Sequence, residues 1–182
     1  MDIIRKNSDE LLHLVDNVLD VARLESEHPS FYMVDCDVIA LGRGIVDSLR
    51  LAPTAQQLTI VFESQYDSFI LHTDPQRLQQ IIENLLYNSF KFTPKGGQVT
   101  LSIEKDSERN QLVFSVSDTG CGIPVGMHER IFERFTKVDD FIQGMGLGLT
   151  ICRMVIRHLS GDIWVDPNYN AGARFIFTHP TK

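Results

Sequence analysis

One helix restricts the possible folds of this chain more than any other segment. Asp74 and Pro75 mark its start, since Asp is a preferred N-cap and Pro suits the first helical position. After them, apolar residues recur at helical spacing at Leu78, Ile81, Ile82, Leu85 and Leu86. A stripe of this kind predicts an amphipathic helix that lies against a hydrophobic layer built by other parts of the chain.

Two asparagines and a lysine lie beside this apolar stripe. At about 100° per residue, Asn84, Asn88 and Lys91 fall within a sector of roughly 60°. Asn is a poor residue for a helix interior because its side chain competes for backbone hydrogen bonds, so two on one edge indicate a function. An amide oxygen is a hard ligand suited to Mg²⁺, and an ammonium group suits phosphate. For the two asparagines alone, a solvated helix edge remains the alternative.

The rest of the pattern predicts a sheet beside the helices. Apolar residues alternate along 98–104 and 111–117, which indicates two strands joined into a hairpin by the polar segment 105–110. Further strands are expected at 58–62, 69–72, 162–165 and 174–178, and further helices at 38–51 and 150–159. We therefore expect an α+β fold, a two-layer α/β sandwich with one helical layer on a mixed sheet.

Residues 3–26 carry a separate helical pattern with heptad spacing. Ile4, Leu11 and Val18 recur every seven residues, and Ser8, Val15 and Ala22 follow each of them by four. This spacing is typical of a coiled-coil-like seam, although an amphipathic helix packed on its own domain would show it too. Pro29 ends the pattern.

Two glycine-punctuated loops complete the set of candidate sites. Asp118 ends a predicted strand and opens DTGCGIP, in which the glycines allow a flat ligand to approach the backbone and the carboxylate can accept from an exocyclic amine. An ordinary Asp-Gly turn is the alternative. The run GMGLGL at 144–149 leads into a helix, whose free N–H groups favour phosphate. It matches neither a Walker A loop nor a Rossmann fingerprint.

Composition excludes several classes of protein. The chain of 182 residues has 17 Lys+Arg against 24 Asp+Glu and a net charge of −7, with no basic cluster, which argues against nucleic-acid binding. Its 3 cysteines form no CxxC pair, so we expect neither a zinc site nor disulfides, and a reducing compartment fits. No apolar run approaches the ~18 residues of a membrane helix.

Together, these segments resemble the ATP-binding domain of sensor histidine kinases, within the gyrase/chaperone/kinase ATP-fold superfamily. The N box is similar to 74–94, the G1 box to 118–124, the F box to 131–135 and the G2 box to 144–149, with a weaker third glycine motif at 170–175. The resemblance covers 31–182 and implies a Bergerat-type ATP fold, a mixed, mainly antiparallel sheet with helices on one face. Residues 1–30 resemble the second helix of a dimerisation hairpin whose first helix is missing.

The resemblance also implies roles for individual residues. Asn88 would bind Mg²⁺ with help from Asn84, Lys91 would meet the phosphates, and Asp118 would bind the adenine amino group. The implied nucleotide site consists of Asn84, Asn88, Lys91, Phe92, Asp118, Gly120, Gly122, Ile123, Gly144, Gly146, Leu147 and Gly148. A mobile lid between Gly122 and Gly144 would carry Phe132, Arg134, Phe135 and Lys137.

The first N-box position indicates the reaction. In hydrolysing members of the superfamily it is a glutamate that activates water, whereas here it is Asn84, and Glu83 faces away from this flank. The resemblance therefore implies transfer of the γ-phosphoryl of Mg-ATP to a histidine and then to a response-regulator aspartate. None of the 6 histidines, His13 included, lies in an H-[DE]-x-R-x-P box, so we do not expect this chain to phosphorylate itself.

Two other functions stay open at this point. One is a water-hydrolysing ATPase of the same fold, and the other is a degenerate scaffold that binds partners without nucleotide. The partners expected for the kinase are ATP, a response-regulator receiver domain and a second copy bound through 3–26, with no nucleic acid and no membrane contact by this part. We expect this part to be the cytoplasmic portion of a membrane-anchored sensor.

Overall fold

The computed structural model describes residues 12, 15–26, 29–52, 57–136 and 146–181. Its seven strands are β1 (Val34–Asp37), β2 (Thr59–Ser64), β3 (Ile70–Thr73), β4 (Gln98–Asp106), β5 (Gln111–Asp118), β6 (Ile163–Val165) and β7 (Arg174–Pro180). The longer helices are α2 (Val38–Arg50), α3 (Pro75–Phe92) and α4 (Gly148–His158), and two 3₁₀ turns are η2 (Val125–Met127) and η3 (Arg130–Phe132).

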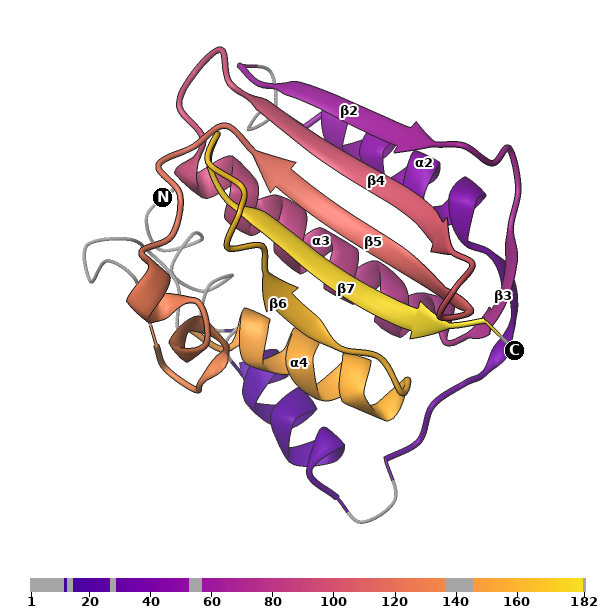
Figure 1. Cartoon of the computed structure of the whole chain (residues 1–182). Coiled ribbons are helices and arrows are strands. Elements are labelled where there is room, and N and C mark those ends of the chain that lie inside the picture. Colours follow the sequence, from indigo (N-terminus) through magenta and orange to yellow (C-terminus); the bar gives the residue numbers. More distant parts are fainter. Residues whose placement is uncertain (1–11, 13–14, 27–28, 53–56, 137–145, 182) are drawn as a thin grey trace.

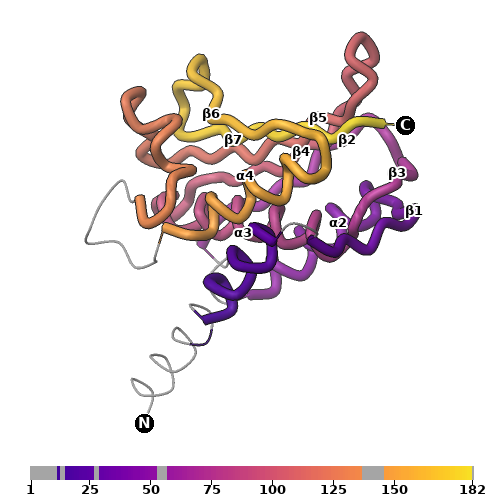
Figure 2. Tube along the Cα trace, turned by 90° about the horizontal axis from the view of Figure 1, so that it is seen from below, coloured from indigo at the N-terminus to yellow at the C-terminus, as the bar shows by residue number. Residues whose placement is uncertain are grey.

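The strands form two sheets. The larger has five strands in the order β2-β4-β5-β7-β6, and a two-stranded sheet pairs β1 with β3. In the larger sheet only β2 and β4 run parallel, while the other neighbours are antiparallel. Helices α2, α3 and α4 lie on one face of this sheet, as the edge-on view shows (Figure 2), and the other face is toward the viewer in Figure 1. The predicted two-layer α+β fold with a mainly antiparallel sheet is confirmed.

The helix predicted from Asp74 has the expected start and the expected buried face. The Asp74 carboxylate caps α3 by accepting from the backbone N–H groups of Gln76 and Arg77, each at 3.1 Å. All five residues of the predicted stripe are 0% exposed, as are the inward residues of β4 and β5 that form the core beside them: Val99, Leu101, Ile103, Leu112, Phe114 and Val116. The central helix therefore has one fixed face on the sheet, which also fixes where its polar flank lies.

The other predicted elements are present with ends shifted by one or two residues. The hairpin of β4 and β5 is in register from Val99 opposite Asp118 to Asp106 opposite Gln111. The sequence pattern had not predicted β1, a four-residue segment of mixed polarity that pairs with β3. Its pairing depends on a partner 37 positions away, as between Asp35 and His72, so no local pattern indicates it.

The N-terminal helix covers residues 15–24 within the described part of the chain. It packs on the domain through Val21 and Leu24, 8% and 3% exposed, while Val15 and Val18 of the predicted seam are each 46% exposed. Asp20 accepts hydrogen bonds from Arg77 and Gln80 of α3 at 3.1 and 2.7 Å.

One face of this helix is therefore packed on its own domain, and the heptad seam lies on another face. The seam residues at 3–11 lie outside the described residues. None of the described helices combines the length and the apolar character that crossing a bilayer requires.

Candidate functional site

The middle of α3 meets the first turn of α4 at Asn84. A Cβ placed on Gly148 would lie 3.5 Å from Asn84 Oδ1 and 3.9 Å from its Nδ2, so the amide oxygen is the nearer atom. No side chain caps α4 at its N-cap residue, Leu147, which is 3% exposed. Among the described residues, the Asn84 oxygen therefore faces a helix start whose N–H groups have no side-chain acceptor, an arrangement that favours an anion and its counter-ion.

The buried thiol of Cys152, on α4, interacts with the Asn84 side chain. The Cys152 thiol is fully buried, and its sulfur lies 4.0 Å from the carbonyl oxygen of Ile81. Burial raises the pKa of Cys152 to about 12, while a hydrogen bond from the Asn84 side chain acts in the opposite direction. The Asn84 side chain thus lies between the buried Cys152 thiol and the first turn of α4, to which its amide oxygen is the nearer atom.

Glu83 is kept away from this flank. Its carboxylate accepts a hydrogen bond from Gln79 Nε2 at 2.8 Å, one turn earlier on α3. Among the described residues no group of three or more His, Cys, Asp or Glu side chains could hold a metal ion. A cation here would be bound by amide oxygens, ligand phosphates and water, a set of hard oxygen donors that fits Mg²⁺.

The last two turns of α3 continue the same flank. Asn88 is half-buried, and Lys91 is exposed with its Nζ 5.8 Å from the ring centroid of Phe92. A Cβ on Gly120 would lie 2.4 Å from the carbonyl oxygen of Phe92, so the loop after β5 can touch the end of α3 only because residue 120 is glycine.

Asp118 is buried at the end of β5, with 2% of its surface exposed. Its Oδ1 accepts two backbone N–H groups, from Gly120 at 2.9 Å and from Ala173 at 3.1 Å. Within the described part of the chain no group donates a hydrogen bond to the second carboxylate oxygen, Oδ2. The result is a carboxylate that is fixed through one oxygen and can accept a ligand's hydrogen bond through the other.

The loop after Asp118 packs closely against the loop that precedes β7. Gly122 has a φ of +73°, and a Cβ there would lie 3.1 Å from the carbonyl oxygen of Gly172. Ile123 is half-buried against the core, and its carbonyl oxygen lies 2.9 Å from His128 Nε2. Gly122 therefore lies against Gly172, whose main chain also packs on Asp118.

The two residues expected to anchor the lid behave differently. Phe132 is 2% exposed, its ring packs edge-on against Phe175 at 6.5 Å, and the Arg153 guanidinium lies 4.3 Å from its centroid. Phe135 is 64% exposed with a φ of +60°, and its N–H donates to the carbonyl of Gly146 at 3.2 Å. Phe132 thus belongs to the core, and Phe135 helps to join the chain on either side of 137–145.

Three predicted residues remain: Arg134, Lys137 and Gly144. Gly144 and Lys137 lie outside the described residues. Arg134 forms an ion pair with Glu25, just beyond the N-terminal helix. Sequence reasoning missed Cys152 and Ala173, because an apolar helix residue and a strand-end alanine carry no local sign that their partners are Asn84 and Asp118.

Comparisons with known protein families and sequences found several matches. A family model described as "Histidine kinase-, DNA gyrase B-, and HSP90-like ATPase" matches residues 73–182. Among curated proteins, the adaptive-response sensory kinase SasA of Rippkaea orientalis is 36% identical over 179 residues, 97% of this chain and 45% of that protein. The sensor histidine kinase WalK of Bacillus subtilis is 28% identical over 184 residues, 99% of this chain and 30% of that protein. The chain spans less than half the length of either relative.

Solved structures match over the whole chain or its larger part. Full-length ShkA in complex with AMPPNP has a TM-score of 0.87 at 31% identity, covering 99% of this chain and 38% of that one. The catalytic domain of the histidine kinase ThkA has a TM-score of 0.74 at 27% identity, covering 83% of this chain and 97% of that one. ThkA in complex with the response regulator TrrA has a TM-score of 0.81 at 24% identity, covering 100% of this chain and 50% of that one, and shows the fold alone.

Proposed function

The chain belongs to the family of histidine kinase-, DNA gyrase B- and HSP90-like ATPases, and from this membership we propose that residues 31–182 form the ATP-binding catalytic domain of a sensor histidine kinase. The observation that supports this most directly is the arrangement along one flank of α3. Gly120, from the Asp118 loop, touches Phe92 at its end, and Gly148 of α4 lies against Asn84 eight residues earlier, or about 12 Å along the helix. Groups suited to a base and to phosphates thus lie at two ends of one site.

In this proposal each residue has a defined task. Asp118 Oδ2 accepts from the adenine 6-amino group, while Oδ1 stays bound to its two backbone donors. Lys91 and the first-turn N–H groups of α4 bind phosphate oxygens, and the amide oxygens of Asn88 and Asn84 bind Mg²⁺. A bound magnesium ion supplies charge neutralisation and orientation of the phosphates.

The proposed reaction is transfer of the γ-phosphoryl group to a histidine outside residues 1–182. Transfer depends on positioning and charge neutralisation rather than on a base that activates water. The carboxylate nearest in sequence, that of Glu83, is bound to Gln79, and this supports transfer over hydrolysis.

Calorimetry with Mg-ATP tests the metal assignment. We expect Asn88→Ala to weaken Mg-ATP binding by more than about 100-fold. Removing a residue that only orients a metal ligand costs up to about 100-fold, and removing a ligand itself should cost more. Without Mg²⁺, in EDTA, the variant and the wild type should bind ATP alike. Asn17→Ala, on the N-terminal helix, is the matched control and should leave both affinities unchanged. Equal Mg-ATP affinity of Asn88→Ala and wild type would remove Asn88 from the metal role.

Incubation with γ-labelled ATP separates the kinase from its two competitors. We expect no label on this chain alone and no steady phosphate release. Label that is stable to base and labile to acid would contradict the first expectation. Phosphate release that is lost in Glu83→Gln would favour a hydrolase, and the absence of any thermal shift with Mg-ATP would favour a nucleotide-free scaffold.

The proposed partners are a second copy of the chain and a response-regulator receiver domain. The seam within 3–26 supports the first, because Val15 and Val18 of the seam are each 46% exposed, and Leu12 and Leu19, which widen the apolar stripe, are 63 and 46% exposed. We expect sedimentation to detect self-association that Val18→Asp weakens, and a monomeric wild type would contradict it. The division into 1–30 and 31–182, and a cytoplasmic position below a membrane anchor, belong to the same proposal.

A further inference from the structure

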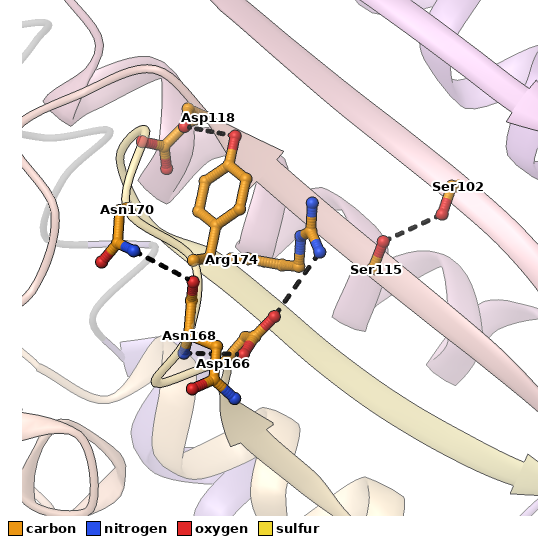
Figure 3. Close-up of polar contacts among 8 residues, drawn as sticks. Ser102, Ser115, Asp118, Asp166, Asn168, Asn170 and Arg174 are labelled. Atoms are coloured by element: carbon orange, nitrogen blue, oxygen red, sulfur yellow. Dashed lines mark hydrogen bonds and ion pairs between the residues drawn. The ribbon is translucent and has the colours of Figure 1, made fainter.

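The loop between β6 and β7 forms several hydrogen bonds with Asp118. Asp118 donates its N–H to the carbonyl of Ala173 at 2.9 Å and accepts the Ala173 N–H on Oδ1 at 3.1 Å. The Tyr169 hydroxyl donates to the main-chain carbonyl of Asp118 at 3.2 Å. Figure 3 shows Asp118 at the end of β5 with the loop that carries Asn168 and Asn170 beside it. A segment more than fifty positions away in sequence therefore contacts both the main chain and the carboxylate of Asp118.

Tyr169 itself is held in place by charged neighbours. The guanidinium carbon of Arg174 lies 4.2 Å from the Tyr169 ring centroid, and Arg174 Nη1 lies 3.5 Å from Asp166 Oδ2. Asp166 is fixed in turn, since its N–H donates to the Arg174 carbonyl at 2.8 Å and its Oδ1 accepts the N–H of Asn168 at 2.9 Å. The Arg174 guanidinium over the ring, itself paired with the hydrogen-bonded Asp166 carboxylate, therefore restricts the orientation of the Tyr169 side chain without a ligand.

The main chain of the loop also approaches Asp118 closely. A Cβ on Gly172 would lie 2.2 Å from the Asp118 carbonyl oxygen and 2.7 Å from its Oδ1. The main chain of Gly172 is therefore packed directly on Asp118. Of the loop's side chains, Tyr169 is the one that binds Asp118, and it does so on the main-chain side, away from the carboxylate oxygen left for a ligand.

We propose that Tyr169 is a positioning residue that sets the selectivity of this site for the 6-amino group of adenine, acting through Asp118. The inference rests on the proposed function, because it takes Asp118 as the base-binding carboxylate. Without the Tyr169 hydroxyl, the Asp118 carbonyl loses a donor and the residue gains freedom. The bond from Oδ2 to the amino group then weakens, while contacts to the phosphates are unaffected.

The test compares two nucleotides that differ only at the position Asp118 would bind. Affinities for ATP and for purine riboside 5′-triphosphate, which lacks the 6-amino group, are measured by calorimetry with Mg²⁺. We expect Tyr169→Phe to weaken ATP binding by about 3- to 10-fold, the range for losing one hydrogen bond, and analogue binding by less than about twofold. Asp118→Asn is the reference and should abolish the preference for ATP.

Tyr66→Phe is the matched control. The Tyr66 ring packs edge-on against Phe69 at 5.8 Å, near the end of β2, and within the described residues its hydroxyl has no hydrogen bond. This variant should keep the wild-type ratio of the two affinities. Arg174→Met removes the cation from the Tyr169 ring and keeps the hydroxyl. We expect its ratio of ATP affinity to analogue affinity to lie between those of wild type and Tyr169→Phe. This variant also tests the inference if Tyr169→Phe folds poorly.

The possible outcomes separate this inference from the proposed function. In one outcome, wild type prefers ATP, but Tyr169→Phe and Arg174→Met have the wild-type ratio of ATP affinity to analogue affinity, including the case in which both affinities fall equally. Tyr169 is then merely structural, and the inference is overturned while the proposed function stands. If wild type binds no ATP, or binds both nucleotides equally, the role of Asp118 fails and the inference fails with it.

Discussion

The two ends of the proposed site are built in opposite ways. At the base end, made of Asp118 with the loops 118–123 and 169–173, the Asp118 and Ala173 side chains are buried and hydrogen bonds join Asp118 to both loops. The phosphate end, made of the polar flank of α3, the first turn of α4 and the joined residues 135 and 146, has exposed side chains such as Lys91 and Phe135. One end is preformed, and at the other no side chain in the described part of the chain caps the N–H groups that begin α4.

This difference follows from what each end is proposed to bind. A purine is flat and keeps one shape throughout a reaction, so a rigid carboxylate selects it best. A triphosphate must be enclosed, brought to an acceptor and released, which requires chain segments that can separate at low cost. The predictions below would break or sharpen this contrast, and they run from the largest expected effect to the smallest.

Gly172→Ala should give the largest loss of stability. The added Cβ would lie 2.2 Å from the Asp118 carbonyl oxygen and 2.6 Å from the Gly120 nitrogen, both main-chain atoms that cannot move aside. We expect the free energy of unfolding in guanidinium chloride to fall by about 3 kcal/mol. Gly126→Ala is the control, because its Cβ would meet nothing within 4 Å. Equal denaturation midpoints for the two variants would show that the base end is not rigid.

Thiol labelling tests whether the floor beneath the phosphate end is closed to solvent, with an exposed cysteine as the reference. Cys152 lies fully buried beneath Asn84, and burial raises its pKa to about 12, so its thiol is both protonated and shielded from reagent in the folded chain. Cys121 is exposed in the loop after Asp118. We expect iodoacetamide, followed by mass spectrometry, to modify Cys121 at least about 100-fold faster than Cys152. Comparable rates in the folded chain, with the unfolded chain as reference, would contradict this.

Gly146→Ala should separate affinity from stability at the phosphate end. Gly146 has a φ of +67°, and a Cβ there would lie 2.5 Å from the Thr136 carbonyl oxygen, so an alanine would push residues 136 and 146 apart. We expect Mg-ATP to bind about 10-fold more weakly and adenosine to bind as before, with unfolding changed by less than about 1 kcal/mol. A stability loss as large as that of Gly172→Ala would mean that both ends are equally rigid.

His179 serves as a reference outside both ends and should give the smallest effect. It is 4% exposed on β7, its Nδ1–H donates to the Pro180 carbonyl at 2.8 Å, and its Nε2 accepts from the Thr73 hydroxyl at 3.1 Å. Burial lowers the pKa of His179, so the unfolded chain binds the proton more tightly.

The stability contributed by neutral His179 is therefore complete above the unfolded pKa of about 6.5 and falls as pH drops toward the lowered folded pKa. His179→Gln should flatten this part of the pH profile in thermal unfolding and leave nucleotide affinity unchanged. The same slope in both proteins would assign the pH dependence to other groups.

The N-terminal helix shows where local prediction stops. Its heptad spacing correctly predicted a helix over the described residues 15–24, but the residues that pack on the domain are Val21 and Leu24, outside the predicted seam. Several faces of this helix carry apolar side chains, so the pattern alone could not select one. The contacts of Asp20 with Arg77 and Gln80 show which face meets α3.

The sequence by itself determined the elements whose signals are local. Asp74, Pro75 and five apolar residues specified the start, length and buried face of α3, because capping and helical periodicity act within a few residues. Alternation specified the β4–β5 hairpin in the same way, and four motifs in order indicated the family.

Only the tertiary structure decided which distant segments meet. It paired β1 with β3, set Cys152 beneath Asn84, and placed Tyr169 and Ala173 behind Asp118, 51 and 55 positions away. A tyrosine in a turn or an alanine before a strand looks the same in sequence whatever it contacts. Its partner depends on how the whole sheet and its helices pack together, and that is why the sequence indicated the groups of the site but not the residues that hold them in place.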